Sequence, residues 1–214
     1  LTNSILFAAL LALIGVAILY AALIAILLSL TTNVLAYRRM ELRIIAKVNA
    51  EEIDKGSYPK FENLVAGLCV AHGFRNPNLF VVPDSAPNMM MVGKNSSLGN
   101  LIVTTGLLEK VNRVELEGLI THELSRIRNR LAFLECTTAV LVAKPFVFFP
   151  GFVKFVTAKL FAPWSVAETD LQAVALTRYP TALANALSSL SIDGRELRVN
   201  PKFCRHLWIN PPAK

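Results

Sequence analysis

The residues best suited to do chemistry lie in one ten-residue stretch, Thr121 to Arg130, which reads THELSRIRNR. His122 and Glu123 begin the pattern His-Glu-x-x-His, in which two histidines one helical turn apart bind zinc. The glutamate of that pattern acts as general base on the zinc-bound water of a peptidase. Arg126, however, occupies the position of the second histidine. The match is weak by itself, because His-Glu occurs on many solvent-exposed helices.

The elements around this stretch can be predicted from start signals and periodicity. Asn112 is a good N-cap and Glu115 stands at the capping-box position, so a helix should begin there and carry His122 in its middle. Before it, three short β-rich runs predict a small sheet, at 79–82, 88–92 and 101–104. Helical spacing predicts four further helices, at 42–52, at 58–73 with Gly73 as C-cap, from Pro163 to Thr177, and from Pro180 with Leu183, Leu187 and Leu190 as its buried stripe.

The N-terminal region is long and apolar enough for a membrane span. Ser4 to Leu30 contains no charged residue, and a bilayer core needs about 20 apolar residues as a helix. A signal peptide is the rival interpretation, but its apolar region is only about 7–15 residues long. The basic residues that follow are opposed only by Glu41, which places the main domain on the cytoplasmic side; they are Arg38, Arg39, Arg43 and Lys47.

Composition limits the other functional classes. The net charge is +7, but the positive charge gathers beside the apolar segment, so membrane contact is favoured over nucleic-acid binding. The three cysteines are far apart and lack metal-ligand spacing, as expected of packed, reduced thiols. A second apolar stretch, at about 131–162, is interrupted by Pro and Lys, so it predicts either a membrane-associated hairpin or a second pass.

Several segments in the same order resemble the HtpX-like family of integral-membrane zinc metalloproteases. They are Pro87-Asn-Met-Met-Met-Val-Gly93, Leu101-Ile-Val-Thr-Thr-Gly-Leu-Leu108, the His122-Glu123 helix, Val166-Ala-Glu-Thr-Asp170 and His206-Leu-Trp-Ile-Asn-Pro211. The resemblance covers roughly residues 35–211. It implies an α+β, mostly helical fold: a gluzincin-type domain with a small sheet, plus one or more transmembrane helices. The domain boundaries expected are 1–34 for the membrane segment and 35–214 for the protease-type domain, with the hairpin embedded in it.

The departures from the family pattern concern the metal ligands. The resemblance places His122 as a ligand and Glu123 as the general base, but puts Arg126 and Val166 where two further ligands belong. A guanidinium has no lone pair to give a metal, and valine has no donor atom. Glu168 should face away from the side that Val166 faces, because two residues along a helix turn it by about 200°. The other histidines, His72 and His206, are expected to be structural or solvated.

Arg126 has a positive interpretation as well. It shares a helix face with Glu123, three residues before it, so its charge could fill the vacated metal position by pairing with Glu123 or with Asp170. A second candidate site is the strand at Asn88, Met89, Met90 and Met91, where the family has a substrate-side edge strand. That strand could add a substrate or partner peptide, or its methionines could simply pack in the core.

The sequence thus predicts a cell-membrane pseudoprotease without zinc, which acts as an accessory, scaffold or regulatory subunit and binds another integral membrane protein. The alternative is an active zinc-dependent endopeptidase with a non-standard metal site, and a third possibility is a folded anchor that only stabilises a larger assembly. The bilayer is an expected partner and nucleic acid is not. Whether the chain is single-pass or multi-pass stays open.

Overall fold

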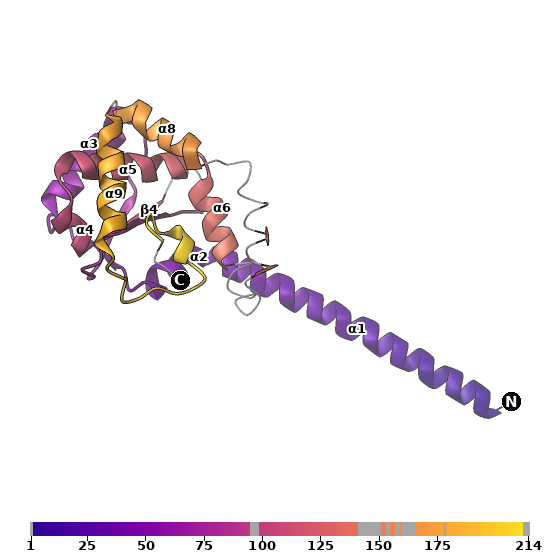
Figure 1. Cartoon of the computed structure of the whole chain (residues 1–214). Helices are drawn as coiled ribbons and strands as arrows, with labels where there is room; N and C mark the ends of the chain where they lie inside the picture. The colour runs from indigo at the N-terminus through magenta and orange to yellow at the C-terminus, as the bar shows by residue number, and fades with distance from the viewer. Residues whose placement is uncertain are drawn as a thin grey trace. The chain divides into compact units, whose positions relative to one another are not determined.

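The computed structural model describes residues 2–94, 99–140, 166–177 and 179–211, with short pieces at 151–152, 155–156 and 159. Within these ranges, side chains are described from residue 15 onward, except at 166–170 and 177, which belong to the helix Val166–Thr177. The chain divides into two compact units, Leu1–Arg39 and Met40–Lys214. Figure 1 shows the labelled elements of both units.

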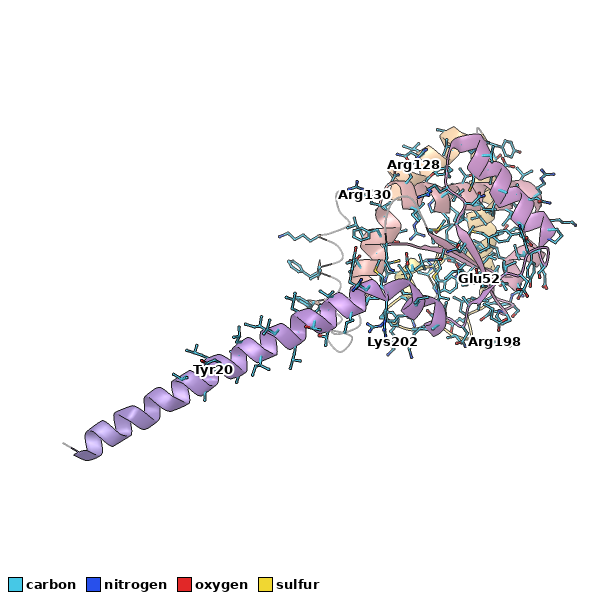
Figure 2. All side chains as sticks on the ribbon, turned by 180° about the vertical axis from the view of Figure 1, so that it is seen from behind. Tyr20, Glu52, Arg128, Arg130, Arg198 and Lys202 are labelled. Atoms are coloured by element: carbon cyan, nitrogen blue, oxygen red, sulfur yellow. The ribbon has the colours of Figure 1, made fainter. Side chains whose placement is uncertain are left out.

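The first unit is a single long helix, α1, which runs from Thr2 to Arg38. Its Gly15–Arg38 part is long and apolar enough to cross a bilayer, judged by length and composition. Polar groups near its end bond to its own backbone: Thr31 Oγ1 donates to Leu27 O at 2.7 Å and Asn33 Nδ2 to Ser29 O at 2.8 Å. Such internal bonds are required inside a bilayer, where water cannot supply them. Tyr20 and its apolar neighbours project outward along this helix (Figure 2), so α1 supports association with a membrane.

The second unit contains a four-stranded sheet of order β1-β2-β4-β3. The strands are β1 Glu51–Glu52, β2 Asn78–Val82, β3 Met89–Val92 and β4 Asn100–Thr104. The β2–β4 pair is parallel, whereas β1 is antiparallel to β2 and β3 is antiparallel to β4. Three of these strands confirm the sequence prediction. The fourth corrects it, because the helix expected at 42–52 ends at Lys47 and β1 follows. Asn49, at φ 54°, turns the chain there, a left-handed conformation that Asn tolerates better than most residues.

Helices cover the sheet and most begin or end as their sequences predict. They are α2 Met40–Lys47, α3 Pro59–His72, α4 Thr105–Lys110, α5 Arg113–Arg128, α6 Leu131–Thr138, α8 Val166–Thr177, α9 Pro180–Asp193 and the short 3-10 turn η2 Arg205–Leu207. The helix α3 ends at Gly73, whose φ of 68° closes the last turn as a left-handed C-cap. Both α3 and α9 have Pro at the first turn, where its missing N–H costs nothing. The fold class expected from the sequence is confirmed: mostly helical with a small sheet.

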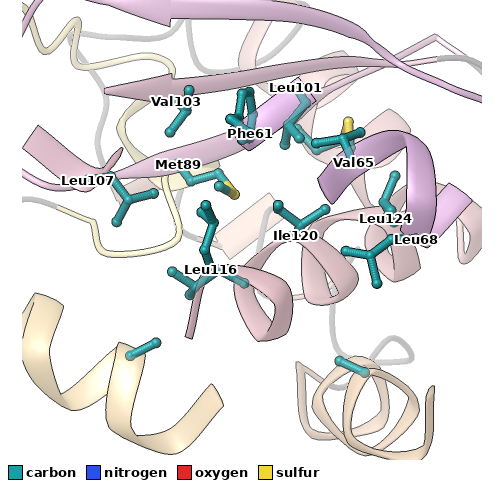
Figure 3. Close-up of a cluster of buried hydrophobic side chains, with 14 of the residues drawn as sticks. Phe61, Val65, Leu68, Met89, Leu101, Val103, Leu107, Leu116, Ile120 and Leu124 are labelled. Carbon is teal, nitrogen blue, oxygen red and sulfur yellow. The ribbon is translucent and has the colours of Figure 1, made fainter. Parts of the chain in front are cut away.

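The main core lies between the sheet and α5. In Figure 3, Met89, Leu101 and Val103 of the sheet face Leu116, Ile120 and Leu124 of α5, and α3 adds Phe61, Val65 and Leu68. On its other side α5 contacts α8 and α9. The approach to α9 is close, because a Cβ at Gly118 would lie 3.2 Å from Leu183 N. The helix that carries the candidate chemistry is therefore buried from several sides.

Candidate functional site

The helix α5 is positioned from its first turn by the predicted capping box. The Asn112 side chain accepts hydrogen bonds from Val114 N and Glu115 N, and the Glu115 carboxylate accepts from Asn112 N at 3.0 Å. These bonds satisfy backbone donors that every helix start leaves open. The rest of the helix then runs into the core, where His122, Glu123, Ser125 and Arg126 are all buried.

Arg126 lies at the centre of a buried charge cluster on this helix. Its Nη1 donates to both oxygens of Glu123, at 2.7 and 2.8 Å, one helical turn earlier. Its Nη2 donates to Glu135 Oε2 on α6. The Glu123 side chain is fully buried and that of Arg126 is 8% exposed. A guanidinium of this kind can be held in a protein interior because two carboxylates meet its fork.

The segment around η2 closes the cluster from a third side. Leu207 O accepts from Arg126 Nη1 at 3.4 Å, and His206 Nε2 lies 3.3 Å from Glu135 O. His122 Nδ1 lies 3.4 Å from Glu123 Oε1. Residues from α5, α6 and the C-terminal segment therefore surround the position of Arg126.

The two carboxylates respond to this environment in opposite directions. Burial alone would raise the pKa of Glu123, but the Arg126 guanidinium and His122 outweigh it and hold that pKa below its ordinary value. Burial raises the pKa of Glu135 above its ordinary value despite the contact with Arg126, and the charge of Glu123 adds to the rise. One guanidinium cannot fully compensate two buried carboxylates. Glu123 and Arg126 thus form the ionised pair, and Glu135 is the carboxyl that more readily keeps a proton.

Burial and neighbouring charges also set the pKa values of His206 and Arg126. Burial, joined by the nearby charge of Arg126, lowers the pKa of His206 and so favours its neutral form. Burial would lower the pKa of Arg126, but its two carboxylate partners raise it further above the usual range. Arg126 is therefore a fixed positive charge.

The described side chains do not fit a zinc site. Among residues whose side chains the structure describes, no group of three His, Cys, Asp or Glu comes together as metal ligands. Arg126 stands one turn from His122 and offers N–H donors only. Both oxygens of Glu123 are bonded to that guanidinium. The resemblance placed His122, Glu123, Arg126 and Val166 at the metal site. Among those whose side chains the structure describes, only His122 could donate a lone pair to a metal without first breaking an ion pair with arginine.

The structure places the other predicted site residues as follows. Of the two partners predicted for Arg126, Glu123 is in contact with it. Asp170 and Val166 belong to α8, where only the backbone is described at these positions. Asn88 and Met89 to Met91 are 0–3% exposed. Their side chains therefore pack in the interior, as the second interpretation of this strand expects, and the addition of a substrate or partner peptide at Asn88 to Met91 stays a prediction.

Glu135 is the functional residue that the sequence reasoning missed. It stands in the first apolar part of the stretch at 131–162, for which the sequence predicted a membrane-associated hairpin or a second pass. In the structure, the part of this stretch that forms α6 packs against α5, β3 and η2. The rest of that stretch lies mostly outside the described residues. A single acid in an apolar run is the signal that could have indicated a buried partner for a cation.

Comparison with known proteins finds relatives of one peptidase family. The pattern of peptidase family M48 matches residues 59–187. A protein described as "Protease HtpX homolog" from Dictyoglomus thermophilum is 30% identical over an alignment 224 residues long, gaps included. The alignment covers 90% of this chain and 74% of the relative. The homolog from Dictyoglomus turgidum is 31% identical, over 89% of this chain and 73% of the relative. One from Thermoanaerobacter pseudethanolicus is 37% identical over 51% of this chain and 36% of its own length. The chain belongs to peptidase family M48 and is an HtpX-like member of it.

Proposed function

We propose that this chain is a membrane pseudoprotease: a protease-type domain without zinc chemistry that serves as an accessory, scaffold or regulatory subunit of a membrane complex. Its domain lies on the cytoplasmic side of the cell membrane, as the basic residues after the apolar helix indicate. Its partner is another integral membrane protein. The observation that carries the proposal is the buried pair of Arg126 with Glu123.

Because of this pair, two requirements of metal-assisted hydrolysis are not met: a second metal ligand and a general base that faces water. A catalytic zinc needs lone pairs from several side chains and an open position for water. Arg126 supplies N–H groups in place of a lone pair at the second ligand position. A general base must face the water that it deprotonates, but both Glu123 oxygens accept from Arg126. The arginine also supplies the positive charge that keeps the buried glutamate ionised, which a metal ion would otherwise supply.

The decisive experiment measures zinc and proteolysis on the purified chain and on variants that restore the family ligands. The wild type is expected to contain no stoichiometric zinc and to show no chelator-sensitive cleavage of casein. Arg126→His combined with Val166→Glu should bind about one zinc per chain. Arg128→His combined with Val166→Glu is the matched control, because it adds a histidine to an exposed position of the same helix. Zinc in the wild type, with cleavage that a chelator abolishes, would establish the endopeptidase instead.

The endopeptidase remains the second candidate because His122 and Glu123 stand together on the buried helix as in the family pattern. It requires Arg126 to leave Glu123 and ligands to come from side chains outside the described region. For the pseudoprotease, co-purification from gently solubilised membranes should give a stoichiometric integral-membrane partner. A chain that purifies alone at every detergent strength would contradict the role as a subunit.

A further inference from the structure

Among the strands that the structure describes, β3 lies at one edge of the sheet, so one of its sides has no neighbour among them. An open edge of this kind exposes backbone N–H and C=O groups that can pair with an extended peptide. On β3 the groups of Asn88 point inward, because Thr104 N donates to Asn88 O at 3.1 Å. Alternation along an antiparallel strand then turns the backbone groups of Met89 to the outer side. Those outward groups are the ones that an added peptide would use.

Residues of the same chain occupy that outer side. Ile209 N donates to Met89 O at 2.9 Å, in the way that a neighbouring strand would. The Asn88 carboxamide continues the pairing: its Nδ2 donates to Asn210 O at 2.7 Å and its Oδ1 accepts from Asn210 N at 3.2 Å. The same Oδ1 accepts from Met89 N at 3.0 Å. The side-chain amide of Asn88 therefore bonds to the backbone N–H and C=O of Asn210, as a peptide group of a neighbouring strand would.

The occupying segment is anchored on both sides of this pairing. Leu207 and Trp208 are buried, at 0% and 2% exposed. The Leu207 carbonyl accepts from Arg126, and Asn210 Nδ2 donates to Leu190 O near the end of α9 at 2.8 Å. The edge strand and the charge cluster are thus covered by one continuous piece of chain, residues 205–210. Figure 1 shows this yellow segment, with η2, beside α6.

We propose that residues 205–210 are an intramolecular occupant of the outer side of β3, which closes this edge of the sheet to extended peptides. This deepens the proposed function and rests on it, since a scaffold without proteolysis has no need to admit a substrate strand. A tethered segment acts at an effective concentration on the order of millimolar, so a free peptide with similar contacts competes poorly. Partners of this domain accordingly bind another of its surfaces.

The first test adds a labelled synthetic peptide copying residues 204–211 to the full chain in detergent and measures fluorescence anisotropy. The wild type should not bind it below about 100 µM, given the millimolar competition from its own segment. Leu207→Ala with Trp208→Ala removes the anchors of the occupant and leaves β3 intact. This variant should bind the peptide at least tenfold more tightly than the wild type, and a scrambled peptide should bind to neither. Equal binding to wild type and variant would overturn the proposal, as would a folded variant that binds no peptide.

The second test needs no variant with a damaged core. Asn210→Ala removes the bond to Leu190 O but keeps the buried side chains of Leu207 and Trp208. Hydrogen exchange of the Ile209 amide should accelerate by roughly fivefold, as loss of one hydrogen bond implies, while that of Ile102 in β4 stays unchanged. If both amides accelerate together, the segment opens only with the whole domain and is no separable occupant. Zinc is measured in the same samples. Stoichiometric zinc with a closed edge would overturn the pseudoprotease and leave the occupant standing.

Discussion

The first turn of α5 and its buried second half follow different rules. The first turn is solvent-exposed and held by its own residues, through the reciprocal bonds of Asn112 and Glu115. In the second half, the guanidinium of Arg126 is held by a side chain of α6 and by backbone of η2. The first turn therefore depends on local sequence, whereas the second half depends on contacts that the chain makes only after folding.

This difference bears on function as well as stability. The exposed first turn carries no candidate site residue. The buried second half carries His122, Glu123 and Arg126, and each constrains the others because none can be hydrated. An arginine buried at such a position needs compensating charge nearby. Glu123 and Glu135 provide that compensation.

The largest expected effect comes from breaking the cluster. Arg126→Ala leaves two carboxylates buried without their cation, which should lower the free energy of unfolding by about 3–5 kcal/mol. Arg128→Ala is the matched control on the same helix. Its guanidinium is exposed and lies 4.7 Å from the Phe74 ring centroid, so its loss should cost less than about 1 kcal/mol. Urea denaturation of both variants measures the difference; equal losses would show that the cluster contributes nothing beyond a surface contact.

The same contrast explains what the sequence could and could not predict. The capping box, the Gly73 C-cap and three strands were predicted correctly because each depends on residues a few positions apart. Glu135 and Leu207 could not be assigned to Arg126, because they are 9 and 81 residues away in sequence and meet it only in the folded domain. The contacts on the outer side of β3 have the same origin, because the segment that bonds to Met89 and Asn88 comes from residues 209 and 210.

A smaller, pH-dependent effect should separate the two carboxylates. The pKa of Glu135 is raised on folding, so the contribution of this group to the free energy of unfolding is fully present below its unfolded pKa, about 4.3. This contribution is lost as pH rises through the native pKa. Glu135→Gln does not titrate, so the variant does not show this loss. Relative to wild type, its free energy of unfolding should therefore increase as pH rises, by at most about 1.4 kcal/mol per pH unit for one proton.

Glu123→Gln is the control of opposite sign for this measurement. The pKa of Glu123 is lowered on folding, so its contribution is present above the unfolded pKa and lost as pH falls through the native value. The Glu123→Gln variant should thus be most destabilised, relative to wild type, at neutral pH. Thermal melts of both variants from pH 4 to pH 8 are the readout. Parallel curves for the two would mean that Arg126 is shared equally and that the assignment of the ionised pair to Glu123 is wrong.

The smallest effect should come from the exposed start of α5. Asn112→Ala removes the acceptor for Val114 N and Glu115 N, which then turn to water, so the loss should be about 1 kcal/mol. Asn112→Asp keeps the acceptor and adds a negative charge at the helix start, so it should match or slightly exceed wild type. Because the cap is local and hydrated, its loss should be additive with that of Arg126→Ala, which lies more than three helical turns away. Urea denaturation of the double variant checks this sum. A deficit well beyond the sum would mean that the first turn and the buried cluster form one cooperative unit, and the contribution of the cap would then no longer be local.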